Sequence, residues 1–226
     1  MAAPVLSLII PCGPLETAAP RIISSGLELP ESWERILSLG PEPNIAPPPD
    51  WTLILGHAGR GAQLNRAASR ASGEWLWFVH ADSLPDAKAV RGVGQFILAS
   101  APRASSGRLG YCRLEFDGDG PAPAAINAIG ANWRSRLFDL PYGDQGLCLR
   151  KRDLIALGGF REDIERGEDL DLVVRAKAAG ISIERFDGTL LTSARRYRQN
   201  GWLRTTVAHQ LAAIRLILAA KRRAPP

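Results

Sequence analysis

Short apolar runs alternate with amphipathic stretches through the first hundred residues of this chain. Runs of aliphatic, aromatic and β-branched residues predict buried strands at 5–10, 33–39, 52–55 and 75–79. Apolar residues at helical spacing predict helices at 17–27, 60–72 and 86–99. This alternation predicts an α/β fold, in which a doubly wound, mostly parallel sheet is flanked by helices.

The second half mixes its elements less regularly, and we expect it to build the other wall of a cleft. Strands are predicted at 110–116, 145–149 and 181–186, and helices at 123–137, 151–157, 168–179 and 203–221. The 226 residues are 46% hydrophobic and 23% charged, which fits a single globular domain with a sizeable core.

Cysteine usage and hydropathy predict a cytoplasmic protein. Cys12, Cys112 and Cys148 are far apart and form no CxxC pair, which favours a reducing compartment over a disulfide framework or a zinc site. No signal peptide is evident, and no apolar run reaches the ~18 residues that span a bilayer.

The net charge of +5 is concentrated late in the chain, in 195–223. A basic end suits phosphates, anionic lipid headgroups or nucleic acid, and it also fits an ordinary solvated face. No nucleic-acid-binding motif accompanies the charge, so no nucleic-acid partner is expected. The apolar residues of the final helix fit three alternatives: packing on the core, a homodimer contact, or peripheral contact with the inner face of a membrane.

The most informative segment is the end of the apolar run 75–79, where His80-Ala81-Asp82 follows. Ligands of open α/β sheets bind at the carboxyl ends of strands, so Asp82 is well placed to hold a divalent cation against a phosphate. Asp82 or Ser83 equally fits the N-cap of the helix that starts near Pro85.

A second acidic segment, 168–171, begins a predicted helix with three carboxylates. Acidic residues are common in first turns because the helix dipole favours negative charge there. A carboxylate anchored at such a position and facing a cleft could also serve as a general base.

Three further polar segments could carry chemistry. Asp144 and Gln145 lie in a turn and could hydrogen-bond a polyol or cap a neighbouring turn. Gly59-Arg60 precedes a helix and suits a phosphate, although the sequence is not a P-loop. Arg195 and Arg196 could bind phosphate oxygens or form an ordinary basic surface loop.

In this order and spacing, the segments resemble family 2 glycosyltransferases, and within them the bacterial subgroup described as radical-SAM/selenodomain-associated transferase 2. The resemblance spans roughly 5–222 and rests on these segments: 7–11, Gly59-Arg60 with Gln63 and Asn65, 80–82, 143–145, 158–160, Glu168-Asp169 and Arg195-Arg196. It implies a single GT-A-like domain with a nucleotide-sugar-binding half at about 1–100, an acceptor-binding half at about 101–202 and a C-terminal helix at 203–226. It also implies a nucleotide-sugar donor, an acceptor that the sequence leaves unknown, and a divalent metal, Mg²⁺ or Mn²⁺.

The resemblance also implies roles for individual residues. Asp82 would hold the metal against the diphosphate, and Asp169 would deprotonate the acceptor hydroxyl for in-line attack with inversion. The acceptor pocket would be lined by Asp144, Gln145 and Glu168. The donor would be contacted by Pro11, Arg60, Gln63, Asn65, His80, Arg195 and Arg196.

The N-terminal third departs from the family pattern. Leu39 stands where the second strand of relatives usually ends in an aspartate that grips the donor base or ribose. Three explanations stay open: a different donor nucleotide, a base held by Asp50, Trp51 or loop backbone, or a non-catalytic protein that keeps a binding role. A nucleotidyltransferase is less consistent with the sequence, because the loop after the first strand has no basic residue.

Overall fold

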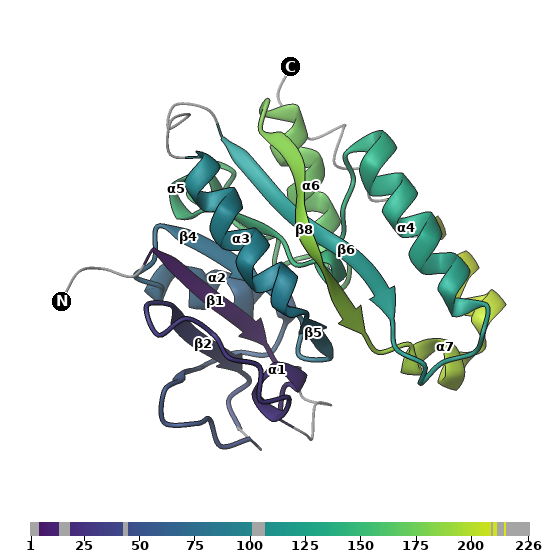
Figure 1. Ribbon diagram of the computed structural model, residues 1–226, viewed down its shortest axis with the longest axis horizontal. Coiled ribbons are helices and arrows are strands. Elements are labelled where there is room, and N and C mark those ends of the chain that lie inside the picture. The colour runs from purple at the N-terminus through teal and green to yellow at the C-terminus, as the bar shows by residue number, and fades with distance from the viewer. Residues whose placement is uncertain are drawn as a thin grey trace.

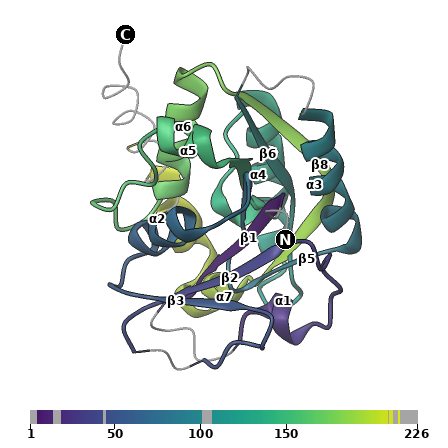
Figure 2. The same cartoon turned by 90° about the vertical axis from the view of Figure 1, so that its left-hand side faces the viewer.

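The computed structural model describes residues 5–13, 19–42, 45–100, 107–208, 210, 211 and 215. They form one eight-stranded sheet, in the order β3-β2-β1-β4-β7-β6-β8-β5, with helices on both faces (Figure 1; Figure 2). The strands are β1 (Leu6–Pro11), β2 (Glu34–Leu39), β3 (Thr52–Leu55), β4 (Trp75–Phe78), β5 (Ser83–Pro85), β6 (Arg108–Phe116), β7 (Cys148–Arg150) and β8 (Ser182–Thr192). The helices are α1 (Arg21–Ser24), α2 (Arg60–Arg70), α3 (Ala87–Ser100), α4 (Ala124–Phe138), the 3-10 turn η2 (Gly143–Gln145), α5 (Lys151–Ala156), α6 (Glu168–Ala178) and α7 (Arg195–Asn200).

The pairing of the strands confirms the predicted α/β class with a mixed, mostly parallel sheet. Strands β3, β2, β1 and β4 are parallel neighbours, and β6 is parallel to β8. The antiparallel contacts are β4 with β7, β7 with β6, and β8 with β5. The divergent second strand is a full member of the sheet, because β2 pairs with β1 on one side and β3 on the other.

The central strands β1 and β4 are buried along their whole length because helices cover both faces of the sheet there. Along β4, Trp75 and Trp77 pack into a core cluster on one face together with residues of α3. Leu76 and Phe78 point to the opposite cluster, which α2, α5 and α6 complete. Because both faces of such a strand are buried, its side chains are apolar along its length, and polar residues follow only at its end.

Two predicted elements are shorter than expected. The helix predicted at 17–27 is reduced to α1, which begins directly after Pro20 and ends before Gly26, whose φ of 69° is left-handed; residues 14–18 lie outside the described part. The strand predicted at 145–149 begins only at Cys148, because Gln145 belongs to η2 and Gly146 adopts a φ of 65°.

The sequence patterns missed β5 and α7. Strand β5 pairs with β8, which is longer than predicted, since it runs through a bulge at 186–188 in which Gly188 has a φ of 111°. The segment expected to be a basic loop forms α7. Of the predicted final helix, residues 202–208 are helical, and most of the remainder lies outside the described residues. Across the described residues, every helix is too short or too polar to cross a membrane.

Candidate active site

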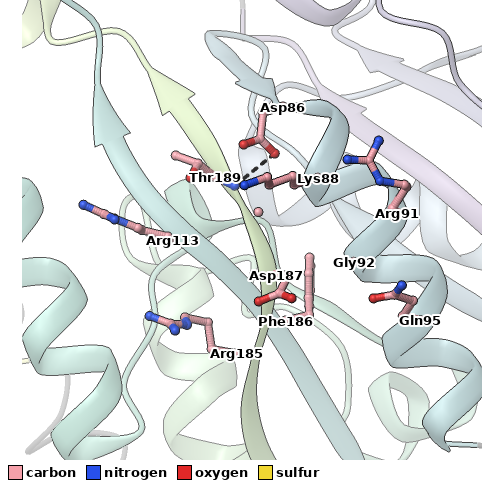
Figure 3. A pocket seen from close by; sticks show the side chains of 11 residues that line it. Asp86, Lys88, Arg91, Gly92, Gln95, Arg113, Arg185, Phe186, Asp187 and Thr189 are labelled. Atoms are coloured by element: carbon pink, nitrogen blue, oxygen red, sulfur yellow. Dashed lines mark hydrogen bonds between the residues drawn. The ribbon is translucent and has the colours of Figure 1, made fainter.

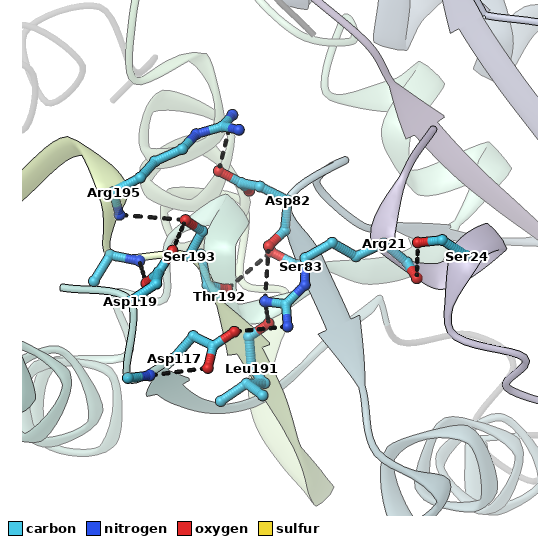
Figure 4. A network of polar contacts seen from close by, with 12 residues as sticks. Arg21, Ser24, Asp82, Ser83, Asp117, Asp119, Leu191, Thr192, Ser193 and Arg195 are labelled. Atoms are coloured by element: carbon cyan, nitrogen blue, oxygen red, sulfur yellow. Dashed lines mark hydrogen bonds and ion pairs between the residues drawn. The ribbon is translucent and has the colours of Figure 1, made fainter. Parts of the chain in front are cut away.

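The carboxyl end of β4 carries the first site residues. Strands β1 and β4 are parallel, so Pro11, which is buried, and the segment after Phe78 reach the same edge of the sheet. Figure 4 shows the Asp82 carboxylate beside Arg195 of α7, at 3.7 Å. The side chain of Arg196 is outside the described set. The predicted N-cap role is not seen at Asp82, because α3 begins only at Ala87, and Asp86 accepts a hydrogen bond from the Ala89 amide.

Asp169 is fixed at the first turn of α6 by two backbone amides. Its Oδ2 accepts from the Gly143 N–H at 2.5 Å, and its Oδ1 accepts from the Leu170 N–H at 2.8 Å. The residue is 7% exposed. Each carboxylate oxygen keeps a second acceptor position, so the group can still take up a proton.

Asp169 is held in its charged form. Burial by itself would raise the pKa of Asp169, but the charges of Arg60 and His80 and the two backbone amides outweigh burial and lower the pKa. The pKa of the neighbouring Glu168 is shifted upward. Burial and the charge of Asp169 raise this pKa and outweigh the charge of Arg60, which lowers it. The two adjacent carboxylates therefore differ in proton affinity, with Asp169 the one that stays ionised.

Gly143 brings three segments together. A Cβ placed on this glycine would lie 2.5 Å from Asp169 Oδ2 and 2.7 Å from His80 Nε2. The end of β4, the turn η2 and the start of α6 therefore meet around one Cα atom. The sequence showed a glycine in a polar turn, and only the fold shows that a side chain cannot be accommodated there.

Asp144 is a partly buried carboxylate with unused hydrogen-bonding capacity. Its Oδ1 is closed to solvent and has no hydrogen-bond partner among the described residues. Burial raises the pKa of Asp144 to about 6; Arg134 opposes this rise, while Asp169 and Asp82 add to it. The electrostatic coupling places Asp144 in the same cluster as Asp82 and Asp169.

Arg60 links the first half of the chain to this cluster. Its Nε forms an ion pair with Oε1 of Glu168, whose side chain is almost fully buried. The charges of Asp169, Glu168 and Asp144 raise the pKa of Arg60 despite its burial. Glu168 Oε2 has no partner in the described structure, so one oxygen of this pair remains available.

Three amide side chains that were predicted to contact ligands form hydrogen bonds within the protein. Gln63 donates to the carbonyls of Cys12 and Ser38 and so ties the ends of β1 and β2 together. Asn65 donates to the Phe160 carbonyl and accepts from the Phe160 amide, both at 2.8 Å. The structure thus gives Gln63 and Asn65 partners within the protein, and their contact with the donor stays a prediction.

Gln145 is fully buried and is likewise a structural residue. Its Oε1 accepts from the Ser135 hydroxyl at 2.6 Å, and its Nε2 donates to the Cys112 carbonyl at 3.2 Å. The side chain therefore joins η2 to α4 and β6. The contact between Gln145 and the acceptor stays a prediction.

The donor-base region keeps the divergence seen in the sequence. Leu39 is a core residue, 3% exposed. Asp50 forms an ion pair with Arg35, and Trp51 packs in the core, so these two side chains have partners other than a nucleotide.

A polar network that the sequence patterns did not reveal supports α7. The Arg21 guanidinium pairs with Asp117 at 2.8 Å, and Asp119 accepts from the Ser193 hydroxyl at 2.5 Å and the Ala194 amide at 2.7 Å (Figure 4). These contacts hold the start of α7, and therefore Arg195, beside the end of β4. Their members lie 74 to 96 residues apart in the chain, so no local motif could identify them.

A cavity of about 510 Å³ lies elsewhere, between α3 and β8 (Figure 3). Its charged lining residues are Asp86, Lys88, Arg91, Arg113, Arg185 and Asp187. None of the predicted site residues lines it. The acidic cluster at the strand ends, rather than this cavity, is therefore the candidate active site.

The site fits a divalent metal that binds together with the phosphates of a nucleotide. Within the described ranges, no three His, Cys, Asp or Glu side chains are grouped to hold a metal ion. Magnesium that binds together with nucleotide phosphates needs only one or two protein carboxylates. Asp82 is partly open to solvent, so its carboxylate fits that mode.

Comparisons with known proteins support the fold. No protein-family model and no curated protein sequence matches the chain. Residues 1–349 of S. aureus TarS, solved with UDP, superpose with a TM-score of 0.64 and 14% identity over 98% of this chain and 66% of that one. The mannosyltransferase PcManGT from Pyrobaculum calidifontis, solved with GDP-Man and Mn²⁺, gives 0.60 and 18% identity over 97% and 69%. The chain spans just under two thirds of that TarS fragment. The fold is therefore that of GT-A glycosyltransferases.

Proposed function

We propose that this protein is a glycosyltransferase of family 2 type that moves a hexosyl group from a nucleotide-diphosphate sugar to an acceptor hydroxyl, with inversion. One observation carries the proposal: the fold gathers Asp82, Asp144 and Asp169 at one sheet edge and keeps Asp169 ionised. Carboxylates with different proton affinities at a strand-end site are typical of a catalytic centre.

Asp169 acts as the general base. The proton of the acceptor hydroxyl moves to a carboxylate oxygen of Asp169 while the acceptor oxygen bonds to the anomeric carbon. The bond from that carbon to the diphosphate oxygen breaks on the opposite side, and the electron pair stays with the diphosphate. The Gly143 and Leu170 amides keep the carboxylate oriented, and base assistance is typically worth about 10²–10⁴ in rate.

The acceptor side is assigned to η2 and α6. Asp144 Oδ1 has no partner among the described residues, so it can accept a hydrogen bond from a second hydroxyl of a polyol. Glu168, held by Arg60, stands beside the base. Glu168 and the Oδ1 atom of Asp144 are closed to solvent, which strengthens polar contacts with the acceptor.

The donor side is assigned to the end of β4 and α7. Asp82 would hold Mg²⁺ or Mn²⁺ against the diphosphate, and the metal when bound neutralises charge that grows on the leaving group. Arg195 lies beside Asp82 and adds positive charge at the same position, so it favours departure of the diphosphate. The three cysteines are buried thiols, which suits action in the reducing cytoplasm.

Donor binding is the first test. Thermal stability is measured against UDP, GDP, CDP and their sugars, each with and without Mn²⁺. A metal-dependent rise in Tm with one nucleotide, lost in Asp82→Ala, is the expected result, because a ligand that binds only the folded state stabilises it.

Asp169→Asn separates binding from chemistry. Because Asp169 acts on the acceptor rather than the donor, we expect this variant to keep the Tm shift and to lose transfer by about 10²–10⁴. Substitution of the exposed Asp163, which forms an ion pair with Arg161, is the matched control. Undiminished transfer by Asp169→Asn would contradict the role of the base.

A non-catalytic binding protein on the same fold is the second candidate. The observation in its favour is the apolar Leu39, together with the pairing of Asp50 with Arg35, at the place where a donor base would be gripped. If no nucleotide changes the Tm with or without metal, this second candidate replaces the first.

A further inference from the structure

Helix α4 exposes its large side chains and buries its small ones. The buried residues of the helix are Ala124, Ala128, Ala131 and Ser135. On the outer side lie Ile126, Ile129, Trp133, Leu137 and Phe138, each more than half exposed. A helix that only had to cover the sheet would carry the reverse arrangement.

A second helical segment extends this apolar surface. Leu203, Val207 and Leu211, in the segment after α7, are also exposed. The Asn127 amide donates to the Thr206 hydroxyl at 2.8 Å, so the segment lies against α4, as the yellow ribbon beside α4 in Figure 1 shows. We call these eight side chains the outer apolar face. They make up eight of the twelve exposed large hydrophobic side chains in the described structure.

The outer apolar face has a basic border. Helix α4 contains no acidic residue, and the sequence from 188 to 226 contains none either. That same stretch carries eight arginines and lysines. Arg136 and Arg204 are exposed and adjoin Leu137 and Leu203 in the sequence, and Asp139, which follows Phe138, is paired with Lys177. Apolar and aromatic side chains bordered by arginine form the pattern that binds in the headgroup region of an anionic bilayer.

We propose that the outer apolar face binds the surface of a membrane that contains anionic lipids. The face lies flat on the bilayer, with the isoleucines, leucines and Trp133 among the acyl-chain ends and the arginines against lipid phosphates. The positive charge argues against a second copy of the chain as the occupant, because two such faces would bring like charges together.

The proposed membrane surface and the candidate active site share α4. Arg134, on the same helix, lies over the Tyr142 ring, 3.4 Å from its centroid, and its charge acts on Asp144. Docking of α4 therefore brings the acceptor side of the site to a lipid surface. The membrane proposal does not depend on transfer activity, because it rests on α4 and the following segment alone.

Vesicle sedimentation tests the proposal without donor or metal. The full chain is mixed with vesicles of phosphatidylcholine, alone or with phosphatidylglycerol. We expect sedimentation with the anionic vesicles and little with the neutral ones. The double change Ile129→Gln and Trp133→Gln should lower the partition coefficient by at least about tenfold, and each of Arg136→Gln and Arg204→Gln by about fivefold.

The matched control is Leu98→Gln, which removes an exposed leucine, 74% exposed, from α3 outside the outer apolar face. It should sediment like the unchanged chain. Equal sedimentation of the control and the Ile129/Trp133 variant would overturn the proposal, as would the absence of binding to anionic vesicles.

Two measurements test whether a second copy of the chain, or another segment of the same chain, covers the outer apolar face instead. They are light scattering after size-exclusion chromatography, and thermal melting. A dimer that the Ile129/Trp133 variant converts to a monomer would overturn the membrane proposal in favour of a second copy. A lower Tm in that variant, without vesicle binding by the unchanged chain, would overturn it in favour of an intramolecular cover.

Discussion

Replacing Asp144 with asparagine measures what burial of a carboxylate costs at the candidate active site. Burial raises the pKa of Asp144 from 3.8 to about 6, so the folded protein keeps this proton in a pH range where the unfolded chain has released it. Because the folded state binds more protons there, stability falls as the pH rises through that range. Above both pKa values the cost reaches about 3 kcal/mol, from about 1.4 kcal/mol for each pKa unit.

The neutral amide of Asp144→Asn avoids this cost. We expect its free energy of unfolding, relative to the unchanged chain, to increase by about 2.4 kcal/mol between about pH 4 and about pH 7. Urea denaturation in the presence of a chelator measures the difference. Packing differences between carboxylate and amide do not depend on pH, so they cancel in this comparison.

The same substitution at the exposed Asp187 serves as the control for a change of surface charge. The reasoning would be refuted if the difference in free energy of unfolding between Asp144→Asn and the unchanged chain were constant with pH. An advantage of Asp144→Asn that grows as the pH falls would also refute it, since the folded state would then stabilise Asp144 as an anion. We also expect Asp144→Asn to weaken transfer, because the substitution replaces a carboxylate whose Oδ1 is an unused acceptor.

Two further substitutions test the packing around the site. Gly143→Ala places a Cβ against Asp169 and His80, so we expect kcat to fall by about 10²-fold in a sugar-transfer assay; an unchanged kcat would contradict the close approach. Asn65→Ala removes both hydrogen bonds to Phe160, so we expect a loss of about 1–3 kcal/mol in urea denaturation with the donor KM unchanged. A raised KM without destabilisation would instead support direct contact between Asn65 and the donor.

Local pattern was sufficient for most strands and for the placement of the acidic residues. The apolar run before His80 predicted β4, and Asp82 lies at its carboxyl end as expected. The helix that begins at Glu168 was also predicted at its observed start. These features can be recognised from consecutive residues. A strand buried on both faces is a run of apolar residues, and a helix start is often acidic.

Other features could not be deduced from the sequence because their cause is distant in the chain. The amides of Gln63, Asn65 and Gln145 suggested ligand contacts, yet their partners belong to other strands and turns of the same protein. Strand β5 was missed because its three residues become a strand only by pairing with β8, more than a hundred residues later.

The sequence alone determined the α/β class, the positions of β1, β2, β3 and β4, and the three acidic segments that later form the site. The tertiary structure decided which of those segments meet, how Gly143 fits between Asp169 and His80, and which carboxylate is ionised. It also decided that α4 turns its large side chains outward. The pattern of apolar and polar residues along the sequence shows which positions tend to be buried. Which face is covered, and how a pKa responds to a charge from another element, depend on contacts that exist only after the chain has folded.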